Sequence, residues 1–470
     1  MLLNLDRQDP SSICAVDDLG HETTYGELMA DARLIAGHVP PRSLVYAFCE
    51  NSMPSLAGYV AFLANGIVPL LLDRDLDEGM RGKLIETYRP AYLWMPGDIA
   101  VQGCERVFCL GSYDLLRTGL RPYPLHEDLA LLITTSGSTG SPKLVRQTYR
   151  NIESNARSIS EYLGIDATER PITTLPMNYV YGASVINSHL SSGATILLTT
   201  KGVVQREFWS FFRDRSATSL AGVPYTYEIL KRLRFFRMDL PSLRTMTQAG
   251  GKLLPELHRE FAQYAEERGK KFIVMYGAAE ATARMGYLPP DRALEKCGSM
   301  GFAIPGGRFS IVDESGRELE GPNVDGELVY YGDNVTPGYA ECGEDLARGD
   351  DRLGRLETGD MVRRDEDGFY YVIGRKKRFL KIFGNRVGLD EMENLIKSRF
   401  LGIECACCGV DDRMHVFITD GSFAGDILAF AADATSLNRS AFIVTTVPEI
   451  PKNESGKIRY ADLEGMCPAT

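Results

Sequence analysis

The sequence lacks a long uninterrupted apolar stretch. The longest candidate, residues 56–72, is broken by Asn65, Gly66 and Pro69, so a helix, a turn and a strand account for it better than a membrane span. The first ten residues contain two aspartates and no long apolar region, which argues against a secretory signal. These two absences lead us to expect a cytoplasmic protein without an integral membrane segment.

The sequence also lacks Cys/His pairs at the spacing of a zinc site, and it has no excess of positive charge. Ten cysteines are scattered over 470 residues, and we expect them to be reduced thiols. Cys405, Cys407 and Cys408 lie close together, but no second Cys/His pair follows at the spacing of a zinc site, and the segment is typical of a strand. The formal net charge of −11 argues against a broad nucleic-acid-binding surface.

Strand and helix signals alternate along the chain. The segments 44–49, 67–72 and 194–198 have the apolar character of buried strands, and helical patterns lie between such segments. This alternation predicts an α/β fold in which helices cover a parallel sheet. A chain of 470 residues is also too long for one small core and indicates two or more domains.

A loop rich in glycine and hydroxyl groups follows the apolar segment 129–133. It reads TTSGSTGSPK, residues 134–143. Small residues let the backbone approach a ligand, and exposed N–H groups, hydroxyls and one lysine suit the oxygens of a phosphate chain. The common P-loop has glycine directly before its lysine, whereas Ser141 and Pro142 precede Lys143 here. A polar surface loop is the alternative interpretation.

The order T-S-G-S-T-G-x-P-K resembles the phosphate-binding loop of the adenylate-forming superfamily. That superfamily includes acyl- and aryl-CoA synthetases, luciferases and amino-acid adenylation domains. Further motifs resemble it in the same order over nearly the whole chain. The resemblance implies that Lys143 takes part in catalysis and that the nucleotide is bound by Thr135, Ser136, Gly137, Ser138, Thr139 and Gly140.

Two later turns resemble the family's adenine-binding segments, namely QAGG at residues 248–251 and YGAAE at residues 276–280. The resemblance assigns Glu280 to catalysis and to Mg²⁺, an ion that prefers hard oxygen ligands and usually engages one or two carboxylates plus substrate phosphates. Ala279 departs from the family, which commonly has threonine there, so one hydroxyl contact is expected to be missing. The implied nucleotide contacts are Gly250, Gly251, Tyr276, Gly277, Ala278 and Ala279.

The motif Thr-Gly-Asp ends at Asp360, where the family has an aspartate that accepts both ribose hydroxyls, and a carboxylate has the two acceptor oxygens for this task. Gly-Arg-Lys-Lys follows, and the resemblance implies that Arg375 contacts the nucleotide and that Lys377 is a hinge. The segment 375–386 has six basic residues and no acidic one. A solvated basic loop is the alternative interpretation of this segment.

The sequence PKNESGKIR, residues 451–459, resembles the loop that carries the family's adenylation lysine, here Lys457. The resemblance implies two domains. An adenylate-forming domain, residues 1–376, would have several parallel sheets covered by helices and would hold the ATP and carboxylate site. A small mobile α+β domain, residues 377–470, would carry Lys457.

The resemblance places Tyr179, Tyr181, Gly182 and Tyr225 in the carboxylate pocket, although the two first tyrosines could equally be core aromatics. Amino-acid-activating relatives typically have aspartate after an aromatic in this turn, where Gly182 stands here. A buried ammonium would lack its partner, which is costly. We therefore expect plain carboxylic acids as substrates, with room for the acyl group beside Gly182.

The resemblance implies a two-step reaction. A carboxylate attacks the α-phosphorus of MgATP and gives an acyl-adenylate and pyrophosphate, and a thiol of CoA or of the phosphopantetheine on an acyl-carrier protein then displaces AMP. The alternatives are an aminoacyl-adenylating ligase for a carrier protein, a phosphotransferase and a non-catalytic nucleotide-binding relative.

Replacement of Lys457 by alanine should cripple adenylation. Loss of one preorganised donor to a developing charge costs roughly 10²–10³ in rate. Thioester formation from a supplied acyl-adenylate should be largely retained. Separate assays of the two half-reactions measure this effect, and an equal fall in both would contradict the role assigned to Lys457.

Overall fold

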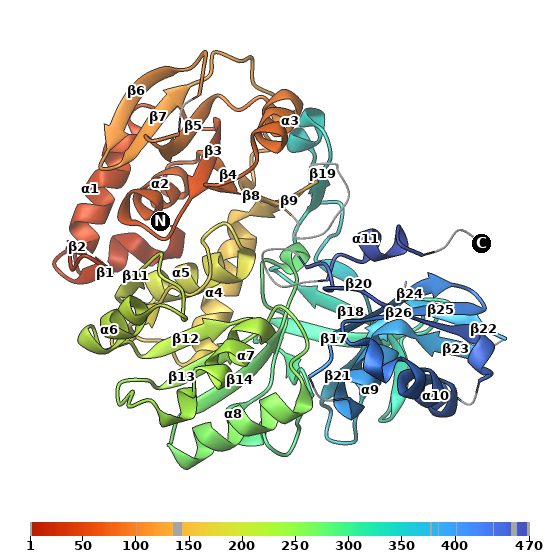
Figure 1. The fold of residues 1–470 in the computed structure, drawn as a ribbon. Coiled ribbons are helices and arrows are strands. Elements are labelled where there is room, and N and C mark those ends of the chain that lie inside the picture. The colour runs from red at the N-terminus through yellow and green to blue at the C-terminus, as the bar shows by residue number, and fades with distance from the viewer. Residues whose placement is uncertain are drawn as a thin grey trace.

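Most of the chain is described by the computed structural model. The described residues are 2–99, 101–134, 143–376, 378–383, 385–400, 402–435, 437–452 and 458–467. They form an N-terminal body, a four-stranded sheet beside it and a C-terminal lobe (Figure 1). In these parts of the chain every helix is too short or too polar to span a lipid bilayer.

Two large sheets build the N-terminal body. In the first, β3, β4, β5 and β8 run parallel at the centre. All six residues of β3 are buried, as expected for a parallel strand covered on both faces. In spatial order the strands are β19 (Gly338–Ala340), β9 (Leu144–Thr148), β8 (Leu129–Thr134), β4 (Val68–Asp73), β3 (Leu44–Cys49), β5 (Tyr92–Pro96), β7 (Tyr113–Arg117) and β6 (Glu105–Leu110).

The second sheet has nine strands, and the six from β14 to β1 in spatial order run parallel to one another. In spatial order they are β16 (Phe302–Ala303), β15 (Gly286–Tyr287), β14 (Lys271–Tyr276), β13 (Thr245–Gln248), β12 (Ser219–Gly222), β10 (Pro171–Ile172), β11 (Ile196–Leu198), β1 (Ile13–Asp17) and β2 (Glu22–Thr24). The predicted α/β class is confirmed.

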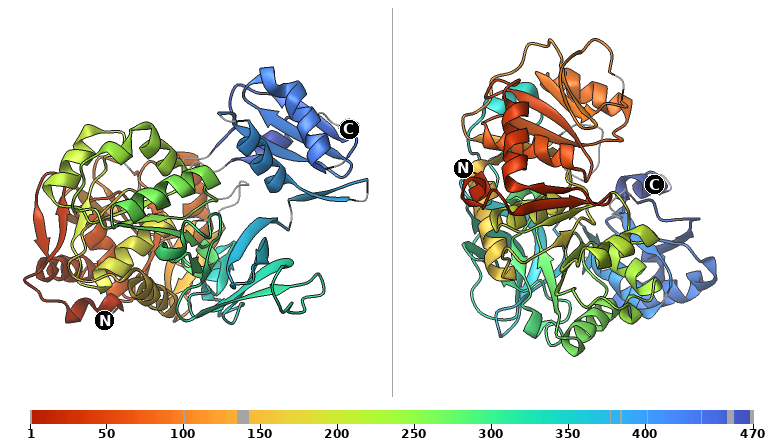
Figure 2. Two further views of the ribbon diagram at one scale, coloured as in Figure 1. Left: turned by 90° about the horizontal axis from the view of Figure 1, so that it is seen from below. Right: turned by 90° about the vertical axis from the view of Figure 1, so that its left-hand side faces the viewer.

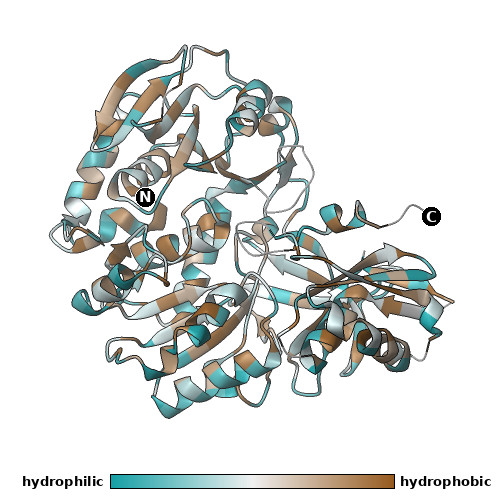
Figure 3. Cartoon of the chain, in the orientation of Figure 1, coloured by the Kyte–Doolittle hydropathy of each residue, from teal (hydrophilic) through white to brown (hydrophobic). Residues whose placement is uncertain are grey.

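Helices fill the space between and around the two sheets. One continuous apolar core joins residues of α1, α2, α4 and α5 to residues of both sheets, and Figure 3 shows the apolar residues concentrated on strands and on one side of the helices. The helices of the body are α1 (Tyr25–Ala36), α2 (Met53–Ala64), α3 (Glu78–Tyr88), α4 (Tyr149–Leu163), α5 (Val180–Ser191), α6 (Arg206–Asp214), α7 (Pro224–Arg232) and α8 (Pro255–Glu267).

An antiparallel four-stranded sheet leads from the body to the C-terminal lobe (Figure 2, left view). Its strands in spatial order are β17 (Gly307–Val312), β18 (Val324–Gly332), β20 (Arg355–Arg364) and β21 (Tyr370–Arg375). The register of the last two strands sets Asp360 directly opposite Arg375. This pairing brings together two residues that the sequence analysis assigned to nucleotide binding.

The C-terminal lobe has its own apolar core. The segment that contains Cys405, Cys407 and Cys408 is a strand, as predicted, and the three thiols are buried on it. The elements of the lobe are β22 (Phe379–Ile382), β23 (Asn385–Gly388), α9 (Leu389–Arg399), β24 (Cys405–Val410), β25 (Arg413–Ile418), α10 (Ala424–Thr435), β26 (Phe442–Thr446) and α11 (Tyr460–Glu464).

A buried ionic network centred on Glu393 ties these elements together. One oxygen of its carboxylate lies 2.6 Å from Nη2 of Arg378 and accepts a hydrogen bond of 2.8 Å from the backbone N–H of Cys407. The other accepts a 2.9 Å hydrogen bond from the Tyr460 hydroxyl, whose ring lies 3.5 Å below the Arg378 guanidinium. The network therefore joins α9, β24 and α11.

Replacement of Glu393 by alanine should destabilise the C-terminal lobe by about 1–3 kcal/mol, because the buried N–H of Cys407 and the Tyr460 hydroxyl lose their acceptor, while Arg378 keeps its ion pair with Asp390 at 2.5 Å. Hydrogen exchange of the β24 and β25 amides measures the change in opening free energy. Glu391→Ala, at an exposed position of the same helix, is the matched control. Equal exchange rates in the two variants would show that the network does not stabilise the lobe.

Candidate active site

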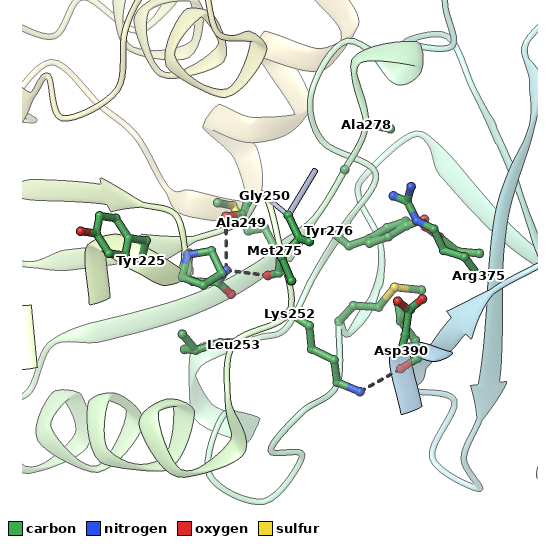
Figure 4. A pocket seen from close by; sticks show the side chains of 18 of the residues that line it. Tyr225, Ala249, Gly250, Lys252, Leu253, Met275, Tyr276, Ala278, Arg375 and Asp390 are labelled. Carbon is green, nitrogen blue, oxygen red and sulfur yellow. Dashed lines mark hydrogen bonds and ion pairs between the residues drawn. The ribbon is translucent and has the colours of Figure 1, made fainter. Parts of the chain in front are cut away.

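A large cleft runs between the N-terminal body and the C-terminal lobe. Its volume is about 2010 Å³. One wall is formed by the turns at the carboxyl ends of β13 and β14, which is where open parallel sheets place their ligand sites. The opposite wall is formed by α9 and by residues flanking the segment 453–457. Figure 4 shows part of the cleft, with Lys252, Tyr276 and Arg375 labelled.

The proposed phosphate-binding residues Thr135, Ser136, Gly137, Ser138, Thr139 and Gly140 lie outside the described residues. Lys143, which follows them, lines the cleft directly before β9. Because β9 pairs with β19, Tyr339 lies opposite Val145, and the ammonium of Lys143 sits 3.6 Å from the centre of the Tyr339 ring. Lys143 also pairs with Glu341 at 3.1 Å.

The turn after β14 is tightly constrained. A Cβ atom on Gly277 would lie 1.6 Å from the carbonyl oxygen of Ala283, so only glycine fits there without a backbone shift. Thr282 and Ala283 adopt positive φ angles of 53° and 98°, which residues with a side chain rarely do. The Thr282 hydroxyl donates to the carbonyl of Asn334 at 2.8 Å and helps to hold this conformation. Such strain persists only where surrounding contacts enforce it, and it is common at functional sites.

This turn presents Glu280 to the cleft. The hydroxyl of Tyr339 donates to Oε1 of Glu280 at 2.6 Å. The backbone carbonyl of Glu280 accepts two hydrogen bonds from Thr336, at 2.9 Å and 3.0 Å. Burial and the neighbouring carboxylate raise the pKa of Tyr339 to about 12, so its hydroxyl stays a donor near neutral pH. The side chain of Glu280 is therefore oriented by a neutral donor.

Three residues assigned to the nucleotide form one contact group. The hydroxyl of Tyr276 donates to Oδ2 of Asp360, and Nε of Arg375 lies 3.1 Å from Oδ1. Burial raises the pKa of Asp360, and the charge of Arg375 together with the Tyr276 hydroxyl opposes that shift. Asp360 is buried, whereas most of the Arg375 side chain is exposed.

The turn after β13 carries Gly250 and Gly251 into the same cleft. Gly250 has a φ of +85°, and a Cβ there would lie 2.7 Å from the hydroxyl of Tyr179. Glycine is thus required by both the backbone and its neighbour. Ala278 and Ala279 also line the cleft, and Ala279 begins a single 3₁₀ turn, Ala279–Ala281.

The three tyrosines assigned to the substrate pocket all line the cleft, but to different extents. Tyr181 is buried, and its hydroxyl donates to the carbonyl of Thr247 at 3.0 Å. Tyr179 meets Tyr181 edge to face, with ring centres 6.3 Å apart. Tyr225 is half exposed on α7.

The structure corrects the expectation for Gly182. It is not among the described residues that line the cleft. A Cβ at this position would lie 2.2 Å from the carbonyl oxygen of Pro176. Glycine is needed here so that α5 can pack against the preceding turn, not to leave room for an acyl group.

The cleft residues that the sequence analysis did not assign include Lys252, Arg284 and Arg352. Lys252 donates to the carbonyl of Val372 at 2.9 Å and so links the β13 turn to β21. Arg352 donates to the Thr336 hydroxyl at 2.7 Å and lies 4.7 Å from the centre of the Tyr339 ring. The sequence could have indicated two of them by their closeness to assigned residues, because Lys252 directly follows Gly251 and Arg284 follows Glu280 by four residues.

The two remaining assignments, Lys377 and Lys457, lie outside the described residues. The segment that contains Lys457 is closed at its base by a β-bridge between Lys452 and Ile458 and by a 2.8 Å hydrogen bond from the N–H of Arg459 to the carbonyl of Pro451. Lys452, Ile458 and Arg459 line the cleft. Both ends of this segment therefore face the body.

Comparison with solved structures shows the fold. The chain is similar to o-succinylbenzoate CoA synthetase from Bacillus subtilis in complex with an acyl-adenylate intermediate, with a TM-score of 0.80 and 22% identity over 98% of this chain and 97% of that one. ATP-bound MatB from Rhodopseudomonas palustris matches with a TM-score of 0.79 and 21% identity over 99% of each chain.

Comparison with curated sequences and family models shows the family. Peroxisomal OPC-8:0-CoA ligase 1 of Arabidopsis thaliana is 30% identical over 355 residues, which are 72% of this chain but only 64% of that protein. Indoleacetate–CoA ligase of Aromatoleum aromaticum is 30% identical over 350 residues, 72% of this chain and 67% of that protein. The model for AMP-binding enzymes matches residues 5–340. The chain therefore belongs to the family of AMP-binding enzymes.

Proposed function

We propose that this protein is an AMP-forming acid–thiol ligase. It activates a carboxylic acid with MgATP, releases pyrophosphate, and transfers the acyl group from AMP to the thiol of CoA. The observation that carries this proposal is the convergence in one cleft of the Tyr276–Asp360–Arg375 group with the group formed by Lys143, Tyr339 and Glu280. A carrier-protein phosphopantetheine as acceptor and a cytoplasmic location remain predictions.

The similar proteins support the same chemistry. Several curated relatives are named as CoA ligases, and solved structures of this fold contain an acyl-adenylate or ATP with a magnesium ion. The chain aligns with less than two thirds of the first of these relatives, so the activity of the whole protein is part of the proposal.

In the proposed mechanism the protein positions reactants and stabilises charge. Asp360 accepts the ribose hydroxyls, while Tyr276 and the glycines of the β13 turn hold the adenine. The charges of Lys143 and Lys457 stabilise the phosphate oxygens while pyrophosphate leaves. A rotation of residues 377–470 about Lys377, relative to residues 1–376, exchanges the faces used in the two steps.

Glu280 fits the binding of Mg²⁺. Its carboxylate is a hard oxygen ligand on the cleft wall, and Tyr339 orients it. When bound, the ion neutralises phosphate charge as ATP is cleaved. Tyr339 holds the Glu280 carboxylate, and Thr336 holds its backbone.

An aminoacyl ligase is the weaker candidate. Position 182 neither lines the described cleft nor has space for a side chain, so it supplies no carboxylate there. The substrate's ammonium would therefore lack the partner that amino-acid-activating relatives typically supply there. A non-catalytic relative is also weaker, because the Glu280 and Asp360 contact groups are both present despite Ala279.

A pyrophosphate-exchange assay tests the proposal. A panel of carboxylic acids and α-amino acids is incubated with MgATP and labelled pyrophosphate, and the products are analysed with and without CoA. We expect exchange with plain acids, AMP as the nucleotide product and a thioester only with CoA. Exchange with no acid would leave a nucleotide-binding role, ADP would indicate a phosphotransferase, and an amino acid with the highest kcat/KM would support the aminoacyl alternative.

Tyr339→Phe should raise the Mg²⁺ concentration needed for half-maximal adenylation by about tenfold or more. The change removes the hydrogen bond to Glu280, and a hydrogen bond to a charged group contributes about 1.5–3 kcal/mol. The ring beneath Lys143 is retained. Magnesium titrations of the exchange rate measure the effect.

Tyr331→Phe is the matched control, because the Tyr331 hydroxyl lies 3.4 Å from Glu318 and the residue does not line the described cleft. An unchanged magnesium requirement in Tyr339→Phe would show that Glu280 does not depend on this hydroxyl.

A further inference from the structure

A buried arginine stands in the wall of the cleft without an acidic partner. Arg284 is 2% exposed and lines the cleft just before β15. Its guanidinium donates to the Ser184 hydroxyl at 3.2 Å, to the Tyr162 hydroxyl at 3.1 Å and to the sulfur of Met275 at 3.1 Å. It also lies 5.0 Å from the centre of the Tyr181 ring. All four neighbours are neutral.

The other buried cations among the described residues, in contrast, pair with carboxylates. Arg146 is 1% exposed and lies 2.6 Å from the carboxylate of Asp351. Lys296 is 9% exposed and pairs with Asp365 at 3.0 Å. Among the described residues no carboxylate forms an ion pair with Arg284. An unpaired buried charge is costly, and nothing in its neutral contacts requires an arginine.

Arg284 is also separate from the groups assigned to the nucleotide. Its side-chain partners lie on α4, α5 and β14, whereas Lys143 and Glu280 meet at Tyr339. Tyr181, which the sequence analysis placed in the carboxylate pocket, lies with its ring centre 5.0 Å from the Arg284 guanidinium. Arg284 therefore lines the cleft beside Tyr181, where the acyl group would lie.

We propose that Arg284 binds a second carboxylate carried by the acyl substrate, so that the protein activates dicarboxylic acids in preference to monocarboxylic acids. One carboxylate reacts with ATP, and the other pairs with the guanidinium, whose planar fork matches a carboxylate. A site built to pair with a charged group rejects an analogue that lacks it, because the buried partner is then left alone. This inference rests on the acid–thiol ligase function proposed above.

Chain-matched acids test the inference. Butanedioate, pentanedioate and hexanedioate are each compared with the monocarboxylate of equal length in the pyrophosphate-exchange assay. We expect at least one dicarboxylate to exceed its monocarboxylate in kcat/KM by roughly 100-fold. If every monocarboxylate equals or exceeds its partner, the inference is overturned while the ligase function stands. If no acid supports exchange, the proposed function itself has failed.

Arg284→Met removes the charge and keeps a flexible side chain of similar length. We expect the preferred dicarboxylate to lose roughly 100-fold in kcat/KM, while its monocarboxylate is unchanged or improves and the KM for ATP stays the same. Arg284→Lys should retain an intermediate preference for the dicarboxylate. Arg150→Met, at an exposed arginine of α4, is the matched control.

Two results of these variants would overturn the inference. An equal loss for both members of a pair would mean that Arg284 binds the reacting carboxylate, and a rise confined to the KM for ATP would place the nucleotide there. If Arg284→Met does not fold, the wild-type protein and Arg284→Lys are compared instead. A weaker dicarboxylate preference in the lysine variant than in the wild type supports the inference, and an unchanged preference overturns it.

Discussion

The cleft depends on the close packing of Gly277 against the carbonyl of Ala283. Because no Cβ intervenes, the chain reverses at once after β14 and adopts two consecutive positive φ angles. This reversal sends Tyr276 towards Asp360, Glu280 towards Tyr339 and Arg284 towards Tyr181. One turn of nine residues thus sets three chemically different contact groups on one wall of the cleft. A change of backbone here would disturb all three groups together.

The opposite wall is coupled to the first through β21. Arg375 at the end of this strand pairs with Asp360, and the chain then enters the C-terminal lobe. In the lobe, Arg378 is held within the network of Glu393 and Tyr460. Only two positions separate Arg375 from Arg378, so the Tyr276–Asp360–Arg375 contact group and the ionic network of the lobe are joined by a very short piece of chain. A displacement of the Asp360–Arg375 pair would therefore be passed directly to the base of the lobe.

The sequence predicted the α/β class and several strands, because apolar runs in parallel sheets are distinctive. Residues 44–49 are β3 as expected, and the predicted strand 67–72 is β4 shifted by one residue. The resemblance to the adenylate-forming superfamily also implied that Tyr276, Asp360 and Arg375 would share a site, and the structure brings them into contact. The roles given to these residues, and to Lys377 and Lys457, stay predictions.

The contacts of Gly182, Tyr339 and Arg284 could not be predicted, because they depend on which segments meet in space. Glycine at position 182 suggested open space for a substrate. The backbone carbonyl of Pro176 occupies that space instead. Tyr339 gains its position from the pairing of two strands that are almost 200 residues apart. No sequence motif marks Arg284 as a buried residue, and its burial follows from the turn that precedes it.

The turn at Arg284 is held through its backbone carbonyl, and not through its side chain. Asn155 and Asn334 each donate to the main-chain carbonyl of residue 284 at 2.9 Å. These bonds are independent of the side chain, so a substitution at 284 can alter the chemistry of the cleft while the backbone keeps its course. Position 284 is thus a place where the charge of the cleft wall can differ between proteins of this fold without rebuilding the turn.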